Sequence, residues 1–73
     1  MNLTQFLALD EEHDISPEQA QLLNRDLATK SVSSIPESGR RRVLEYLVTA
    51  LNLNSVEHDI RAKLDSLVAD LQK

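Results

Sequence analysis

The tetrapeptide Glu-His-Asp-Ile occurs twice and is the first pattern in this sequence that could do chemistry. The copies span residues 12–15 and 57–60, and they place His13 and His58 beside carboxylates. Imidazole and carboxylate both bind zinc and iron, so two copies that met in space could form a metal-binding shell. The flanking residues do not repeat, and acids and histidines are also common in loops and near helix starts. We therefore prefer two unrelated surface segments, with no metal and no cofactor.

Nucleophilic catalysis finds no support in the sequence. The chain has no Cys, and its Ser31, Ser33 and Ser34 lie in a polar connector rather than a glycine-flanked elbow. The segment from Gly39 to Arg42 has a single glycine and no lysine-threonine ending, so it is not a phosphate-binding loop. We predict no catalytic residues and a protein that is not an enzyme.

Three consecutive arginines, Arg40, Arg41 and Arg42, lie at the expected start of a helix, where the helix dipole disfavours cations. The plainer interpretation is that Glu37 and Glu45, each four residues away, pair with Arg41, or that the arginines cover the acidic segment 10–14. The sharper one is a docking patch for an acidic protein. A phosphate backbone is a weaker alternative, because the net charge is −4.

The N-terminal residues form a second candidate binding surface. Leu3, Phe6 and Leu7 share one helical face at spacings of three and four, and Leu9 follows them. They could simply close one end of the core. Alternatively, they form a short helix that lies in the groove of a partner.

The elements that must position these residues are all helical, because the sequence has thirteen leucines, one glycine and two prolines. We predict an all-α bundle of three main helices, at about 16–31, 38–53 and 55–72, after a short helix at about 3–9. Ser16 and Gln19 form a capping box for the first main helix, and Asn54 and Glu57 cap the last. Residues 1–73 make one domain, with 1–14 as N-terminal helix and acidic segment and 15–73 as bundle.

The last two predicted helices carry a broad apolar surface. Between residues 42 and 53 the polar side chains form one narrow line, so most of the surface of this helix must be buried against other helices. The helix after it has the most regular apolar stripe in the chain. A domain of this size is marginal alone, and without Cys it has no disulfides to stabilise it. We therefore predict an oligomer interface, which also supplies part of the core, at Leu44, Leu47, Val48, Leu51, Ile60, Leu64, Leu67 and Leu71.

The start of the chain has no basic segment, and no apolar run reaches the length of a membrane span. We expect a cytoplasmic, acidic protein that does not bind membranes. The order of a capped helix, a polar connector and two leucine-rich helices is similar to that of small enterobacterial two-component connector or biofilm-regulator proteins. Residues 43–48 (VLEYLV) and 60–65 (IRAKLD) carry this resemblance, which assigns no functional residue.

The sequence therefore predicts a non-enzymatic interaction protein. Its partner is another protein chain, in the first instance a second copy, and its role is that of a dimeric regulatory adaptor or anti-activator. Two alternatives remain open. One is a small DNA-binding transcriptional regulator that uses Arg40–Arg42. The other is a secretion-type chaperone.

Overall fold

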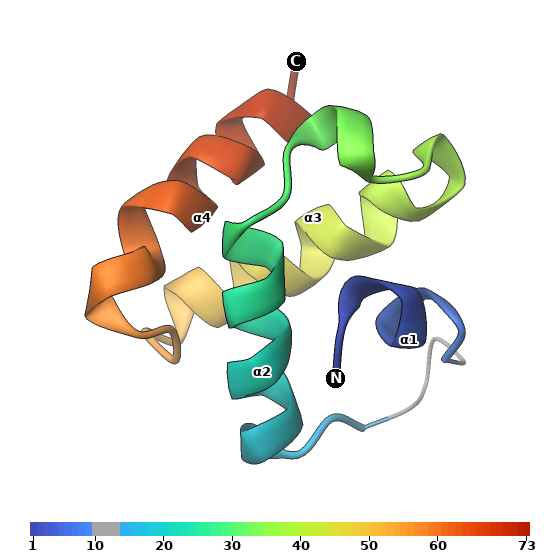
Figure 1. Ribbon diagram of the computed structural model, residues 1–73. Coiled ribbons are helices and arrows are strands. Elements are labelled where there is room, and N and C mark those ends of the chain that lie inside the picture. The colour runs from blue at the N-terminus through green and yellow to red at the C-terminus, as the bar shows by residue number, and fades with distance from the viewer. Residues whose placement is uncertain (10–13) are drawn as a thin grey trace.

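The computed structural model describes residues 1–9 and 14–73, and within them every regular element is a helix (Figure 1). The order is α1 (Leu3–Leu7), α2 (Pro17–Ala28), a 3₁₀ turn η1 (Val32–Ser34), α3 (Glu37–Asn52) and α4 (His58–Leu71). The prediction of an all-α bundle with three main helices and a short first helix is confirmed. Residues 31–34 were predicted to begin a polar connector. They contain the 3₁₀ turn η1, which the sequence did not predict.

Capping residues set the start of the first two helices. In α2 the Ser16 hydroxyl accepts from the backbone N–H of Gln19, and the Gln19 side chain accepts from the backbone N–H of Ser16. This is the predicted capping box, with Pro17 at the first helical position. Asn2 and Gln5 form a second capping box at α1. Both boxes satisfy N–H groups that a helix start leaves without an intrahelical partner.

The predicted start of the last helix at residue 55 is wrong. Asn54 does not cap α4, because it terminates α3 in a left-handed conformation with φ of 54°. The N–H of Ser55 donates to Ala50 O at 3.0 Å, and the N–H of Asn54 donates to Leu51 O at 3.1 Å. These two bonds make a Schellman turn, for which Asn is one of the few residues suited. Glu57 instead occupies the N-cap position of α4, and its side chain makes no capping hydrogen bond.

The start of α1 at Leu3 agrees with the prediction, and the other helix bounds differ from the predicted ones by one to three residues. α1 ends at Leu7 rather than residue 9, because the N–H of Leu9 bonds to Phe6 O in a tighter turn. α2 ends at Ala28 rather than residue 31. At the next residue, the Thr29 hydroxyl donates to Asp26 O at 2.7 Å. Short polar side chains compete in this way with the helical ladder, and helix ends are hard to place from sequence.

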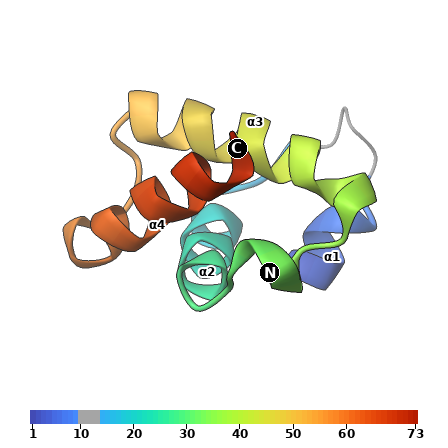
Figure 2. The same ribbon diagram turned by 90° about the horizontal axis from the view of Figure 1, so that it is seen from above.

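α3 crosses over the other three helices. Figures 1 and 2 show α4 on one side of α2 and α1 on the other, with α3 running across all of them as a second layer. The layer beneath α3 is thus continuous from α4 through α2 to α1. The arrangement gives α3 two flanks, one facing α4 and one facing α1.

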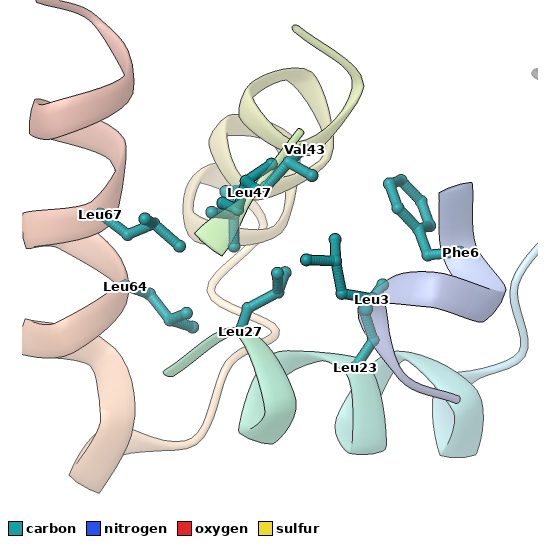
Figure 3. Packing of buried hydrophobic residues seen from close by; sticks show 9 residues of the cluster. Leu3, Phe6, Leu23, Leu27, Val43, Leu47, Leu64 and Leu67 are labelled. Carbon is teal, nitrogen blue, oxygen red and sulfur yellow. The ribbon is translucent and has the colours of Figure 1, made fainter. Parts of the chain in front are cut away.

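One hydrophobic core lies between the two layers (Figure 3). Leu23 and Leu27 of α2 and Val43 and Leu47 of α3 meet in its middle and are fully buried. α4 closes one end of the core and α1 closes the other. The buried hydrophobic side chains that make up the cluster are Leu3, Phe6, Leu23, Leu27, Ile35, Val43, Leu47, Leu64 and Leu67.

Across residues 1–9 and 14–73, none of the helices has the length and apolar character needed to cross a membrane.

Candidate interaction surface

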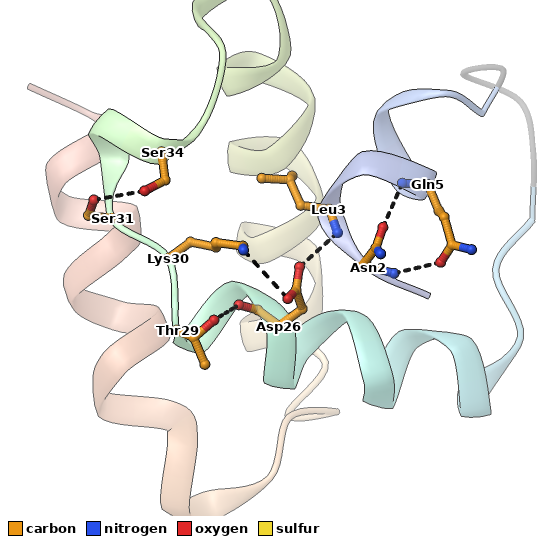
Figure 4. A network of polar contacts seen from close by, with 8 residues as sticks. All are labelled: Asn2, Leu3, Gln5, Asp26, Thr29, Lys30, Ser31 and Ser34. Carbon is orange, nitrogen blue, oxygen red and sulfur yellow. Dashed lines mark hydrogen bonds and ion pairs between the residues drawn. The ribbon is translucent and has the colours of Figure 1, made fainter.

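The N-terminal end of α1 is held by a carboxylate from another helix. Asp26 of α2 accepts a hydrogen bond from the backbone N–H of Leu3 at 2.8 Å, as Figure 4 shows. This N–H belongs to the first helical residue and has no partner inside α1. The negative charge also faces the positive end of the α1 dipole. Asp26 therefore satisfies and orients the start of a helix that lies 23 residues earlier in the chain.

The C-terminal end of α1 is held by an arginine of α3. Arg42 Nη1 donates to the backbone carbonyl of Leu7 at 3.2 Å, and this is the last residue of α1. The Arg42 guanidinium carbon lies 5.2 Å from the centre of the Phe6 ring, in a cation–π contact. A cation at a helix C-terminus is favourable, so α1 has a charge of the suitable sign at each end.

α1 also packs closely on the backbone of α3. Gly39 is buried, and a Cβ at this position would lie 2.5 Å from Leu7 Cδ2. That separation is far below a van der Waals contact between carbon atoms. The side chain of Leu7 can therefore keep its position only because residue 39 is a glycine.

Tyr46 joins α3 to α1 and to α2. Its ring packs against Phe6 with 5.4 Å between ring centres, and its hydroxyl donates to Asn24 Oδ1 at 2.6 Å. A second acceptor, Ala20 O, lies 3.3 Å from the same hydroxyl. Burial raises the pKa of Tyr46 to about 12, because a phenolate would lose its hydration there. Asn24 is the buried polar side chain of the core, and this hydrogen bond accounts for its carbonyl oxygen.

The three consecutive arginines are separated by the structure rather than gathered into a patch. Arg42 contacts α1, as described above, and Arg40 Nε donates to Ile35 O at 3.0 Å. Arg41 points outward with 89% of its side chain exposed, and it pairs with Glu45 at 3.1 Å as predicted. The predicted partner Glu37 lies 3.9 Å from Arg40 instead, at a spacing of three. Two of the three arginines thus bind backbone carbonyls of their own chain.

A fourth and a fifth arginine stabilise the α3–α4 connection. Arg61 Nη1 donates to Asn54 Oδ1 at 2.8 Å, and Arg61 Nη2 lies 3.4 Å from Leu51 O near the end of α3. Arg25 of α2 binds the Glu57 carboxylate with contacts of 2.8 and 3.0 Å. The hydrogen bond and charge of Glu57 raise the pKa of Arg25 above its ordinary value. Sequence spacing does not reveal these pairs, because their partners lie on different elements.

The apolar residues predicted for the oligomer interface divide into two groups. Leu47, Leu64 and Leu67 lie in the core of the chain itself, at 0–3% exposure. The others are half-buried: Leu44, Val48, Leu51, Ile60 and Leu71. We call Leu44, Val48 and Leu51 the α3 stripe, since they follow one another on α3 at spacings of four and three. Within this stripe Leu51 packs against the core cluster.

The N-terminal hydrophobic residues predicted for partner binding also contact their own chain. Leu3 and Phe6 belong to the core at 5% and 6% exposure, and Leu7 packs against it. This is the arrangement expected if the residues close one end of the core. Their binding to a partner stays a prediction, and it would require α1 to leave its position.

Two exposed leucines were not singled out from the sequence. Leu53 is 72% exposed and Leu22 is 54% exposed. The predicted third helix, at about 38–53, includes Leu53. Leu53 lies at the C-cap, where the chain leaves the helical path and the face that each side chain occupies changes.

The proposed meeting of His13 with His58 falls partly on residues 10–13, which lie outside the described residues. Among the residues that the structure describes, no group of three or more His, Cys, Asp or Glu side chains is placed to hold a metal ion. Within the same residues every buried side-chain nitrogen and oxygen has a hydrogen-bond partner. The polar groups of the interior are therefore used in holding the helices together.

Comparisons of the chain with protein-family models, curated proteins and solved structures found no match.

Proposed function

We propose that this protein is a non-enzymatic interaction module that binds another protein chain through the α3 stripe, with a second copy of itself as the first partner. The observation that carries the proposal is the row formed by Leu44, Val48 and Leu51 on a helix whose core-facing residues are already covered. Such a row can bury further apolar surface in an oligomer, and apolar burial is the main source of affinity in homodimers.

The polar rim of the stripe supports the proposal. Arg41 and Glu45 flank Leu44 on the outer surface of α3, and both are exposed. Thr49 and Asn52 continue this polar surface toward the end of the helix. An apolar centre with a charged and polar rim is the common organisation of a protein interface, in which the rim sets partner choice. A regulatory adaptor or anti-activator acts by this kind of reversible burial.

The division of the arginines favours a protein partner over DNA. A DNA-binding regulator needs several cations free to reach phosphates, and here Arg40 and Arg42 donate to carbonyls of their own chain. A mobility-shift measurement at low salt tests this choice. Duplex retardation that disappears steeply with salt would contradict the proposal, and no retardation is expected.

The direct test is the solution mass of the Val48→Asp variant. Light scattering on a sizing column, over a tenfold concentration range, is expected to give twice the chain mass for the natural protein and the chain mass for the variant. The carboxylate would have to be buried unpaired in the dimer, which is costly. Ser66→Asp is the control, since it adds the same charge at an exposed position of α4, outside the α3 stripe and its rim.

The control variant is expected to keep the dimer mass. A natural chain that is monomeric at all concentrations would overturn self-association through the α3 stripe. So would a Val48→Asp variant that stays dimeric while its circular dichroism spectrum is unchanged. The Leu47→Asp change is less suitable for this purpose, because Leu47 is fully buried and its substitution would unfold the chain.

A further inference from the structure

We infer that the groove occupied by α1 is a docking site for a short helix, and that the α1 of a second copy of this chain can occupy it. The α1 groove is formed by Asp26 of α2 and by Gly39, Arg42 and Tyr46 of α3. This inference goes beyond the proposed function, because these groups differ from the residues of the α3 stripe.

The α1 groove recognises the direction and the length of its helix. Asp26 accepts from the first helical N–H, and Arg42 donates to the last helical carbonyl. A helix placed in the opposite direction would present a carbonyl to the carboxylate and an N–H to the guanidinium, and both contacts would be repulsive. The two groups are matched to a helix of five residues, which is about 7 Å long.

The groove also recognises side chains. Gly39 leaves room for Leu7, the fifth residue of α1. The Tyr46 ring and the Arg42 guanidinium both contact the Phe6 ring. Leu3 enters the core one turn earlier. The site therefore fits the pattern Leu-x-x-Phe-Leu, with apolar residues at i, i+3 and i+4.

A second copy is the natural alternative occupant, because its α1 has the same complementarity. A five-residue helix is too short to be stable by itself, so α1 is helical only while it is docked. Its end contacts and the contact with Gly39 come from α2 and α3, and they are equally available to the α1 of another chain. Exchange of an identical element between copies is a low-cost route to a dimer.

What favours the α1 of the same chain is covalent connection. A short connection gives a tethered segment an effective concentration of about millimolar, without changing any contact. Exchange is therefore expected at protein concentrations that approach this range. It is also expected when the resident α1 binds less well than the incoming one.

The first experiment uses the full chain with Phe6→Ala as the receptor and a labelled peptide of residues 1–9 as the probe. The substitution weakens the resident α1 and leaves the groove residues unchanged. Saturable binding of the peptide, measured by fluorescence anisotropy, is expected. The absence of binding at millimolar receptor, while the receptor keeps its helical circular dichroism, would overturn the inference.

Two matched controls locate the bound peptide. A peptide that itself carries Phe6→Ala should bind at least about tenfold more weakly, because the aromatic contacts are lost. A receptor with Phe6→Ala and Gly39→Val should also bind the natural peptide at least about tenfold more weakly, since the new side chain occupies the place of Leu7. Equal binding in either control would place the peptide elsewhere and overturn the inference.

A second experiment tests exchange with the natural α1, and it holds even where the Phe6→Ala chain fails to fold. Thr4 is exposed, and the chain has no Cys, so Thr4→Cys accepts a single spin label. Labelled chains without ¹⁵N are mixed at about millimolar concentration with ¹⁵N chains that carry no label. Exchange predicts paramagnetic broadening at the amides of Asp26 and Gly39 in the ¹⁵N copies.

Broadening confined to other surfaces of the ¹⁵N copies, or its absence, would overturn the exchange of α1. A dimer formed only through the α3 stripe keeps each α1 on its own chain, so it does not place the label beside Asp26 and Gly39 of the other copy. The two proposals can therefore fail separately, since the mass of the Val48→Asp variant tests one and the broadening near Asp26 tests the other.

Discussion

The two flanks of α3 are built in different ways. On one flank α4 packs mainly through its leucines, with Leu64 and Leu67 buried in the core. On the other, α1 adds two core side chains and is held at both ends by charged groups, Asp26 and Arg42. The physical reason for the difference is length. A 14-residue helix can bury enough apolar surface to fix its position, whereas a five-residue helix cannot.

The comparison teaches that a short helix needs its termini recognised. Most of the backbone groups of α1 lie in its first or last turn, where intrahelical partners are missing. Those groups must bond to something, and Asn2, Asp26 and Arg42 supply the partners. The position of α1 is consequently fixed by specific polar contacts at its ends, whereas the position of α4 is fixed mainly by the burial of apolar side chains.

The largest effect is expected from the apolar flank. Leu64→Ala should lower the free energy of unfolding by about 2–5 kcal/mol, because it removes a fully buried side chain and leaves a cavity. Urea denaturation followed by circular dichroism measures this loss. Leu3→Ala is the matched change on α1, and a smaller loss is expected because α1 can detach while the rest stays folded. Equal losses would show that α1 and α4 unfold together and would contradict the comparison.

The next effect comes from the pH dependence of the α1 flank. The pKa of Tyr46 is raised from its ordinary 10.0 to about 12 by burial, so the folded state resists ionisation. The unfolded chain ionises first as the pH rises. The stabilising contribution is therefore complete below pH 10 and is lost between about pH 10 and 12. The loss should be about 1–2 kcal/mol, allowing for partial exposure.

Urea denaturation at a series of pH values, with Tyr46→Phe as the control, measures this contribution. The variant should lack the part of the decline that belongs to the phenol. The absorbance of the phenolate at the same pH values reports ionisation directly. A Tyr46 that titrates near its ordinary pKa in the folded protein would show that this side chain is not held against Asn24 and Phe6.

A smaller and more local effect is expected from Asp26→Ala. The backbone N–H of Leu3 then loses its acceptor, which should weaken the docking of α1 by about 1 kcal/mol. Hydrogen exchange of the Phe6 amide, which bonds to Asn2 O in the docked helix, should become faster. Lys30→Ala removes only the 3.8 Å ion pair of Asp26 and serves as the control. Faster exchange in the control alone would contradict the role assigned to the Asp26 carboxylate.

The smallest effect is expected from Arg41→Gln. Its ion pair with Glu45 is exposed on both sides, and such pairs contribute about 0–1 kcal/mol. We expect no change in the free energy of unfolding beyond error and no change in the exchange of α1 amides. Arg42→Gln, one residue later, should speed the exchange of those amides because it removes the donor to Leu7 O. A reversal of this order would mean that α1 is not held by Arg42.

The helices themselves could be predicted from local sequence. The Ser16–Gln19 capping box and the leucine spacing of residues 60–71 define helices through contacts between residues at most four apart. The all-α bundle follows from them. The start of α4 was misplaced because Asn54 is equally suited to cap a helix or to end one, and the choice depends on where α3 stops.

The candidate sites could be predicted only in part. The pair of Arg41 with Glu45 is local and was predicted. The acceptors of Arg40 and Arg42 are backbone carbonyls, and because every residue has one, the sequence does not show which carbonyl is bound. Composition likewise gave an acidic chain rich in leucine, without saying which leucines remain half-exposed. By itself the sequence determined the helices, because helix formation depends on residues three and four apart. Only the tertiary structure decided that Asp26, Gly39 and Arg42 converge on α1, because the crossing of α3 over the other helices joins residues that are far apart in the chain.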